Sequence, residues 1–148
     1  MNSAFCLAVH ALVYLHHRGE LVSSEELARN ICTNPARVRK VMAGLKKAGL
    51  VETREGSEGG YRFAGEPESL TLDRVAAAVD TRFVAARWRS GSLDQPCLVA
   101  SGMADVIDGL LWELDDRCRA YLSTVTLAEL DRRLKLVKIG RASCRERV

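Results

Sequence analysis

The side chains of this sequence that could bind a ligand are basic residues gathered in one short stretch. Between Thr33 and Arg54 there are six basic residues and a single acid, Glu52. The six are Arg37, Arg39, Lys40, Lys46, Lys47 and Arg54. Such a cluster suits a polyanion, because Lys and Arg neutralise phosphate groups. The solvated face of an ordinary helix shows the same residues. The secondary structure that carries the cluster must therefore distinguish a polyanion-binding surface from an ordinary helix face.

A helix is predicted from Pro35 to Gly49, with Asn34 as its N-cap and Pro35 at the first helical position. Its apolar side chains fall within about 100° on a helical wheel. They are Val38, Val41, Met42 and Leu45. The opposite face carries small and basic residues, namely Ala36, Lys40, Ala43 and Lys47, flanked by Arg37, Arg39 and Gly44. Small residues between charges let a backbone approach a groove floor while long side chains reach phosphates and bases, which favours a DNA-contacting helix.

Two helices are expected before it. Ser3 to His17 has the apolar spacing of a largely buried helix that ends at Arg18-Gly19. Ser23, followed three residues later by Glu26, predicts a capping box at the start of a short helix that ends near Asn30.

The stretch "VETREGSEGGYRF", Val51 to Phe63, predicts a β-hairpin, since alternating segments flank a turn that contains three glycines. A phosphate-binding glycine loop is excluded, because that loop needs a following helix and no GK[ST] pattern is present. A solvated surface hairpin is the simplest alternative. Its position directly after a basic helix favours the wing of a winged helix-turn-helix instead.

The second half of the sequence predicts a short helix capped by Thr71, an irregular linker, and then the longest amphipathic pattern of the chain. The dimerisation candidates in that pattern are Met103, Val106, Ile107, Leu110, Leu114 and Tyr121. A helix of about 20 residues spans roughly 30 Å, too long for a domain of this size to cover. The same helix of a second subunit is the simplest partner. A short terminal helix capped by Thr126 follows.

The segments "NPARVRKVMAGLKKAGLVETREGSEGGYRF" and "LTLDRVAAAVD" resemble the Rrf-two family of bacterial winged-helix repressors. The resemblance covers most of Ser3 to Leu134. It implies a homodimeric transcription factor whose third helix enters the major groove. It also implies that Arg37, Arg39 and Lys40 face that groove, that Arg54 is the wing arginine of the minor groove, and that Tyr61 braces the wing.

Cluster-binding members of that family have three cysteines before the long helix, whereas this chain has only Cys97 there. Asp105 and Asp108 stand where a further ligand is expected, and carboxylates replace thiolates poorly at iron-sulfur clusters. We therefore expect neither an iron-sulfur cluster nor another metal. For Cys97, redox sensing and a silent thiol both stay open.

Several other polar or thiol side chains are predicted to have no functional role. Cys6, Cys32 and Cys118 are expected as small core residues. The Cys6–His10 pair is attributed to packing, and Asp115 with Asp116 to a solvated face.

Composition excludes several classes of protein. The net charge of +3 equals that of residues 138–148 alone, a segment that resembles translated adapter sequence and is set aside as non-native. No apolar run suits a membrane span, the first Lys or Arg is Arg18, and five scattered cysteines suit no disulfide framework, so the expected address is the cytoplasm. No nucleophile has a base at a suitable spacing, so no catalytic residue and no enzyme is predicted.

The sequence thus predicts a mostly α protein with four parts: a winged helix-turn-helix with a two-stranded β wing (1–65), a short helix and linker (66–98), a long dimerisation helix with a terminal helix (99–137), and the tail (138–148). The expected function is a homodimeric repressor that binds a palindromic operator in double-stranded DNA and responds to a redox or other small signal. The DNA-contacting candidates are Asn34, Ala36, Arg37, Arg39, Lys40, Lys47, Arg54 and Tyr61. The alternative is a winged-helix module that binds proteins.

Overall fold

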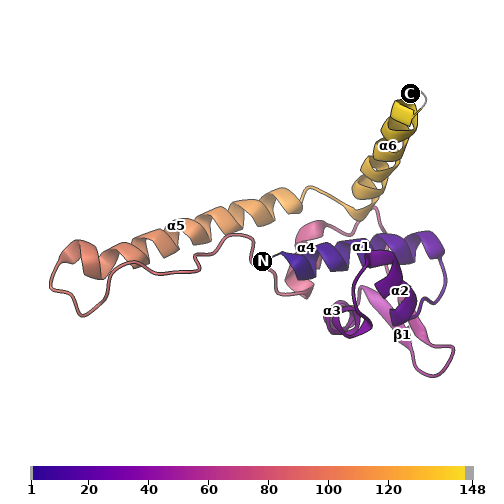
Figure 1. The fold of residues 1–148 in the computed structure, drawn as a ribbon, viewed down its shortest axis with the longest axis horizontal. Helices are drawn as coiled ribbons and strands as arrows, with labels where there is room; N and C mark the ends of the chain where they lie inside the picture. Colours follow the sequence, from indigo (N-terminus) through magenta and orange to yellow (C-terminus); the bar gives the residue numbers. More distant parts are fainter. Residues whose placement is uncertain (1, 146–148) are drawn as a thin grey trace.

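A computed structural model describes residues 2–145, with the side chains of residue 139 and residues 141–145 left aside. Six helices and one hairpin follow one another along this part of the chain (Figure 1). Their order is α1 (Ser3–Arg18), α2 (Ser24–Ile31), α3 (Pro35–Lys47), β1 (Val51–Arg54), β2 (Gly60–Phe63), α4 (Leu72–Ala78), α5 (Leu98–Leu122) and α6 (Leu127–Arg145). This confirms the predicted winged helix with a long helix after it. Figure 1 shows α1 to α4 and the hairpin gathered into one body, from which α5 projects.

The helix boundaries follow from local capping chemistry. Gly19 ends α1 in the left-handed region at φ 64°, a conformation that glycine adopts without strain. The Ser23 hydroxyl accepts the Glu26 N–H at 3.1 Å at the start of α2. Only half of the predicted capping box forms, because the Glu26 carboxylate accepts the Tyr14 hydroxyl at 2.7 Å and pairs with Arg18 at 3.1 Å. The acid therefore ties α2 to α1 instead of returning to its own helix end.

The core of the body is built around α1. Among its largest fully buried side chains, α1, α2 and α3 supply Leu12, Leu15, Leu27, Met42 and Leu45. Burying each of these apolar side chains contributes about 1.5 to 3 kcal/mol relative to leaving it exposed. Four residues of α3 are buried as predicted, namely Val38, Val41, Met42 and Leu45. The basic face of α3 is thereby fixed outward.

The start of α6 returns to this body. Leu127 is buried in the core, and its N–H donates to the Leu70 carbonyl at 2.9 Å. Thr126 caps α6 as predicted, since its hydroxyl accepts the Glu129 N–H at 3.2 Å. Thr71 stands at the N-cap position of α4, but its side chain makes no capping bond. Its backbone instead pairs with Thr126 in an isolated β-bridge.

The terminal helix is longer than the sequence predicts. We expected a short element that ends before residue 138, whereas α6 continues to Arg145. Its apolar periodicity is weak beyond the first two turns, so the sequence pattern predicts a helix that ends too early. Residues 146–148 lie outside the described part, and the foreign origin of residues 138–148 stays a prediction.

The wing is an antiparallel hairpin whose register places Arg54 opposite Gly60 and Val51 opposite Phe63. Its last two glycines are required by crowding. A Cβ on Gly59 would lie 2.1 Å from the Arg54 carbonyl oxygen, and one on Gly60 would lie 2.4 Å from that of Val22. Gly56, at φ 108°, supplies the positive φ that the turn was expected to need.

The predicted burial or exposure of three residues is wrong. Asp115 was expected on a solvated face, but it is only 2% exposed. Burial is possible because its carboxylate accepts the N–H groups of Phe83 at 2.6 Å and Val84 at 3.0 Å and bonds to Arg119 at 3.2 Å. Cys6 and Cys32 were expected in the core, yet both are exposed. Larger apolar side chains of the same helices fill the interior, and Cys118 is half-buried.

Candidate nucleic-acid interface

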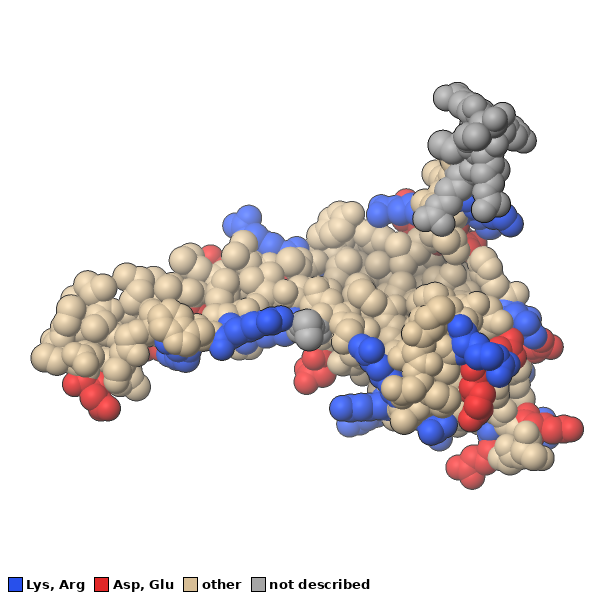
Figure 2. Space-filling view, viewed as in Figure 1, with Lys and Arg blue, Asp and Glu red and all other residues tan. Residues whose placement is uncertain are grey.

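The outward face of α3 presents an exposed basic surface, which Figure 2 shows as blue side chains along the lower edge of the body. Arg37 and Lys40 lie on one flank, where they border a cleft of about 260 Å³ beside the start of α1. Arg39 and Lys46 lie on the other flank, which borders a cleft of about 510 Å³ between α3 and the wing. Ala36, Ala43 and Lys47 are also exposed. The exposed face of this helix therefore has basic side chains on both flanks of a low ridge, which Ala36, Ala43 and Lys47 form.

Gly44 does not belong to that ridge. A Cβ at this position would lie 2.6 Å from the carbonyl oxygen of Ala78 in α4. The residue is small because α3 packs closely against α4, and the proposed role in approaching a groove floor is wrong for this residue. Ala36 and Ala43 keep that interpretation.

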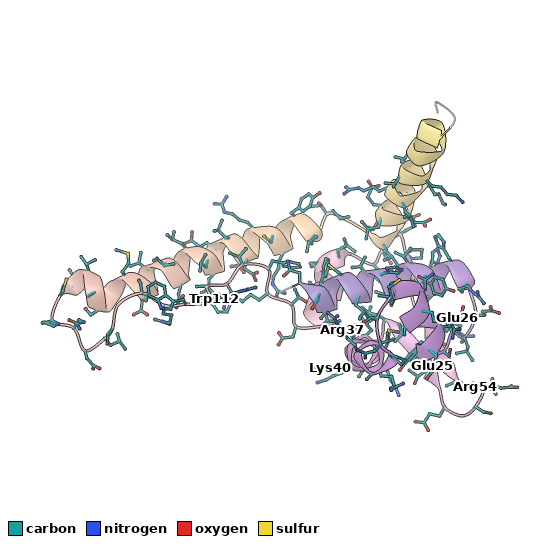
Figure 3. The ribbon with its side chains drawn as sticks, in the orientation of Figure 1. Glu25, Glu26, Arg37, Lys40, Arg54 and Trp112 are labelled. Atoms are coloured by element: carbon teal, nitrogen blue, oxygen red, sulfur yellow. The ribbon has the colours of Figure 1, made fainter. Side chains whose placement is uncertain are left out.

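Arg39 is the cation of α3 that contacts neighbouring side chains within the described part of the chain. Its guanidinium donates to the Ser24 hydroxyl at 3.2 Å and lies 3.7 Å from the Glu25 carboxylate. Figure 3 shows Glu25 beside α3, while Arg37 and Lys40 point away from the body. The α2 contacts direct Arg39 toward the cleft that the wing closes.

Asn34 has a structural task at the start of α3. Its side-chain oxygen accepts the Arg37 N–H at 2.8 Å, which satisfies one of the free donors of the first turn. Only the amide nitrogen of its side chain is then left for a contact with DNA.

Among the described residues, the wing pairs one of its two arginines with an acid and leaves the other, Arg54, without a carboxylate partner. Arg62 pairs with Glu52 at 2.6 Å, and Glu55 and Glu58 are exposed near the turn. Arg54 is exposed, and within residues 2–145 no carboxylate lies within 4 Å of its guanidinium nitrogens. Figure 3 shows it at the outer end of the hairpin. Arg54 is thus available to an anion.

Tyr61 occupies the base of the wing. Its N–H and carbonyl pair with the carbonyl and N–H of Val22 at 2.8 and 2.9 Å, so that the hairpin is tied to the segment before α2. Burial of the ring raises the pKa of the Tyr61 hydroxyl above its usual value, and Arg39 nearby opposes that shift. The geometry agrees with a bracing residue.

The second surface is α5, whose two faces differ. One face holds the linker through residues that recur every three or four positions. Arg89 pairs with Asp105 at 2.6 Å and Asp108 at 2.7 Å, and the Arg82 guanidinium stacks 3.7 Å from the ring centre of Trp112. Asp115 and Arg119 complete this linker-binding face. The local sequence pattern does not predict this face, since the bonded partners lie 16 to 38 residues apart in the chain.

The opposite face of α5 is apolar and uncovered. All six predicted dimerisation residues are exposed, from 37% at Ile107 to 61% at Val106. They are Met103, Val106, Ile107, Leu110, Leu114 and Tyr121. We call this set the α5 stripe. So much exposed apolar surface marks an interaction site.

The described residues do not assemble a metal site in one chain. No three His, Cys, Asp or Glu side chains of residues 2–138, the part whose His, Cys, Asp and Glu side chains are described, lie close enough together to hold a metal ion. Asp105 and Asp108 are engaged by Arg89, and Cys97 is exposed at the N-cap of α5. These residues do not fit an iron-sulfur cluster. Within the same range, no helix has the length and apolar character needed to cross a membrane.

A basic helix beside a wing, on a body that carries a long unpaired helix, defines a winged-helix transcriptional regulator. Residues 1–133 match the Rrf2 model, which is described as an iron-dependent transcriptional regulator, and the chain belongs to this family. The transcriptional regulator IscR of Vibrio atlanticus is 27% identical over 129 residues, which cover 86% of this chain and 71% of that protein.

Solved structures share the fold of this chain. A protein from Lactobacillus plantarum superposes with a TM-score of 0.80 at 27% identity, over 97% of this chain and 99% of the other. The T. potens IscR structure shares the fold, with a TM-score of 0.65 at 18% identity over 90% and 87% of the two chains. The matched family and the Vibrio atlanticus IscR are transcriptional regulators, and the chain is a regulator of this family and not an enzyme.

Proposed function

We propose that this regulator is a homodimeric repressor that binds a palindromic operator in double-stranded DNA. The observation that carries the proposal is the exposed basic face of α3 beside an unpaired wing arginine. A repressor of this kind blocks transcription sterically, and it acts in the cytoplasm, where bacterial DNA lies.

Each candidate has a role that suits its position. Arg37, Arg39 and Lys40 enter the major groove, where Arg and Lys pair with the N7 and O6 acceptors of guanine. Ala36 lets the first turn of α3 approach the base edges. Lys47, at the far end of the helix, contacts a phosphate.

The wing adds a second contact. Arg54 enters the adjacent minor groove, whose negative potential attracts an unpaired guanidinium. Tyr61 keeps the hairpin at a fixed angle to α3, and the amide of Asn34 reaches the phosphate backbone.

The α5 stripe supplies the dimer. Pairing of two identical stripes is isologous and places two copies of α3 about a two-fold axis, which is the symmetry of a palindromic operator. The spacing of the two recognition helices is then set by the long helix.

The signal that relieves repression acts near the linker, since the linker joins the DNA-binding body to the dimerisation helix. Cys97 is exposed at that junction and is the candidate thiol. We propose that no iron-sulfur cluster is bound. Protein purified without oxygen should be colourless, and a brown preparation with stoichiometric iron would overturn this part of the proposal.

The experiment that tests the function is a salt titration of binding to a fluorescent duplex. Each phosphate contact lowers log K by about 0.9 for each log unit of added salt. A regulator with six or more basic contacts should lose affinity by a factor of about 10³ or more between 50 and 200 mM salt. The alternative function, a protein-interaction module, predicts no measurable binding of duplex DNA at either salt concentration.

A further inference from the structure

Two thiols lie on the walls of one cleft in the DNA-binding body. The cleft has a volume of about 430 Å³ and lies beside the start of α3. Cys6 belongs to its α1 wall, and Cys32 belongs to the turn between α2 and α3 that forms the other wall. Both residues are exposed, so a small oxidant in solution can reach both sulfur atoms. We call Cys6 and Cys32 the cleft thiols.

Two hydrogen bonds fix the register of α1 against α2. The Tyr14 hydroxyl donates to the Glu26 carboxylate at 2.7 Å, and the His10 ring bonds to the Asn30 side chain at 2.7 Å. A step back of one turn in α1 is thus matched by a step forward of one turn in α2, so the two helices run antiparallel. The next turn back on this face of α1 brings Cys6.

The end of α2 brings the second thiol to the same place. α2 ends at Ile31, and Cys32 follows as its C-cap, two residues beyond Asn30. The cleft thiols therefore lie across from each other, just past the last bond that joins the two helices. A disulfide holds its two Cα atoms within about 7 Å, so a bridge across the cleft draws the α2–α3 turn toward α1.

The backbone at Cys32 is unusual for a residue that has a side chain. Its φ is 61°, in the left-handed region, and Asp80 is the other non-glycine residue of the described part with a positive φ. Glycine is the common residue at a helix end of this kind, as Gly19 shows at the end of α1. Glycine would serve the turn with less strain, so the fold does not require the thiol at this position.

The same cleft borders the helix that is proposed to contact DNA. Arg37, a major-groove candidate, lines the cleft together with the cleft thiols. Its N–H donates to the side chain of Asn34, which stands two residues after Cys32. Movement of the turn therefore shifts the first turn of α3. Hydrogen bonds to base edges need donor and acceptor within about 3.2 Å, so a small shift is enough to remove them.

We propose that the cleft thiols form a reversible disulfide that lowers the affinity of this regulator for DNA. The effect on binding rests on the proposed function, whereas formation of the bond does not. The oxidant is a hydroperoxide, which transfers one oxygen to the Cys32 sulfur and is reduced to an alcohol, or to water if it is hydrogen peroxide. The Cys6 sulfur then attacks the resulting sulfenic acid, and the hydroxyl group leaves as water with the Cys6 proton. A dithiol reductant reverses the step and restores both thiols.

Peptide mapping without reductant tests the bond. The full chain is reduced, freed of reductant and treated with one equivalent of hydrogen peroxide. Trypsin releases Cys6 in the peptide 1–18 and Cys32 in the peptide 30–37. Mass spectrometry should find these two peptides joined, and the intact single chain should lose the mass of two hydrogen atoms. Two unjoined peptides, or either peptide joined to another cysteine of the chain, would overturn the site.

Binding to DNA tests the consequence of the bond. The probe is a fluorescent duplex enriched from a random pool by the reduced chain. Oxidation should weaken binding by about tenfold or more, as expected when a base contact of α3 is lost, and dithiothreitol should restore it. Cys6→Ser and Cys32→Gly should bind as the reduced chain does and lose the response to peroxide. Cys32→Gly should also fold, because glycine adopts the left-handed conformation without strain.

Cys97→Ser is the matched control. Cys97 is exposed like the cleft thiols, but it precedes α5, whose start Figure 1 shows far from the body. This variant should respond to peroxide as the native chain does. Loss of the response in Cys97→Ser, a response that persists in Cys6→Ser and Cys32→Gly, or a disulfide that leaves the affinity unchanged would each overturn the switch. A reduced chain that binds no duplex would overturn the proposed function instead, and the peptide map would still decide whether the bond forms.

Discussion

The winged-helix body and α5 use the same residue types in opposite ways. The body buries its Leu, Val and Met side chains around α1 and presents bases on α3. In α5, the one residue that is buried is an acid, Asp115, while the stripe of apolar side chains faces solvent. The body therefore has a buried apolar core, to which the start of α6 adds Leu127, and its exposed basic face suits an anion. The long helix is incomplete and needs another apolar surface.

The largest test of this contrast is a charge on the α5 stripe. Leu110→Arg should abolish the dimer and lower the affinity for a palindromic duplex by about 10² to 10⁴, because the two half-sites no longer bind as a linked pair. Light scattering and gel shift measure the two effects. Asp116→Arg serves as the control, since this exposed residue lies away from the stripe, and a similar loss in both variants would indicate that the stripe is not the interface.

A smaller loss is expected at the wing. Arg54→Ala should cost about 1 to 3 kcal/mol of binding to the specific operator, since an unpaired guanidinium that contacts base edges is removed. Arg62→Ala is matched within the same hairpin, but its guanidinium is already paired with Glu52, so its effect should stay within about 0.5 kcal/mol. Unchanged operator affinity on gel shift for Arg54→Ala would remove the wing from the interface.

Asp115, which holds the linker against α5, should affect the free energy of unfolding by a comparable amount. Asp115→Asn should lower the free energy of unfolding by about 1 to 3 kcal/mol, because a buried carboxylate that accepts two N–H groups and pairs with Arg119 loses its charge. Asp116→Asn is the exposed control and should be nearly neutral. Chemical denaturation at pH 7 compares the two.

The same variant predicts a pH dependence. Burial raises the pKa of Asp115, but the N–H groups of Val84 and Phe83 and the Arg119 guanidinium outweigh it and hold the pKa below its usual value. Ionised Asp115 therefore stabilises the fold fully above about pH 4, the pKa of an unfolded aspartate, and this contribution is lost as the pH falls through the lower folded pKa. The difference in stability between the native chain and Asp115→Asn should shrink on acidification. If the difference in the free energy of unfolding stays constant from pH 7 down to pH 2, the stabilising role of ionised Asp115 is contradicted.

The smallest effect is expected at the end of α3. Lys47→Ala should weaken all duplexes alike and reduce the slope of log K against log salt by about 0.9, the share of one phosphate contact. Fluorescence anisotropy on operator and random duplexes at several salt concentrations measures it. A loss confined to the operator would instead place Lys47 at a base edge.

The sequence predicted the body well because its signals are local. The side chains of Asn34 and Ser23 cap their helices by accepting the backbone N–H of the residue three positions later. The burial of Val38, Val41, Met42 and Leu45 follows from helical period alone. The linker-binding face of α5 could not be predicted in this way. Asp115 accepts N–H groups 31 and 32 residues distant, and nothing in its immediate neighbours distinguishes it from the exposed Asp116.

Two errors of interpretation have the same origin. Gly44 was assigned to a DNA-facing ridge, whereas contact with Ala78 of α4 requires its small size. Cys6 was assigned to the core because it neighbours apolar residues, although Leu7 and Ala8 on the adjoining side of α1 fill that space. In both cases a tertiary contact decides which face a residue occupies.

Selection of bound duplexes from a random pool by the purified chain tests the central claim most directly. If the dimer binds DNA through α3 and the wing, the enriched sequences should share a two-fold symmetric motif whose half-sites are about one helical turn apart, or a multiple of it. Recovery of no shared motif, or of a single asymmetric half-site, would contradict a homodimeric regulator of a palindromic operator.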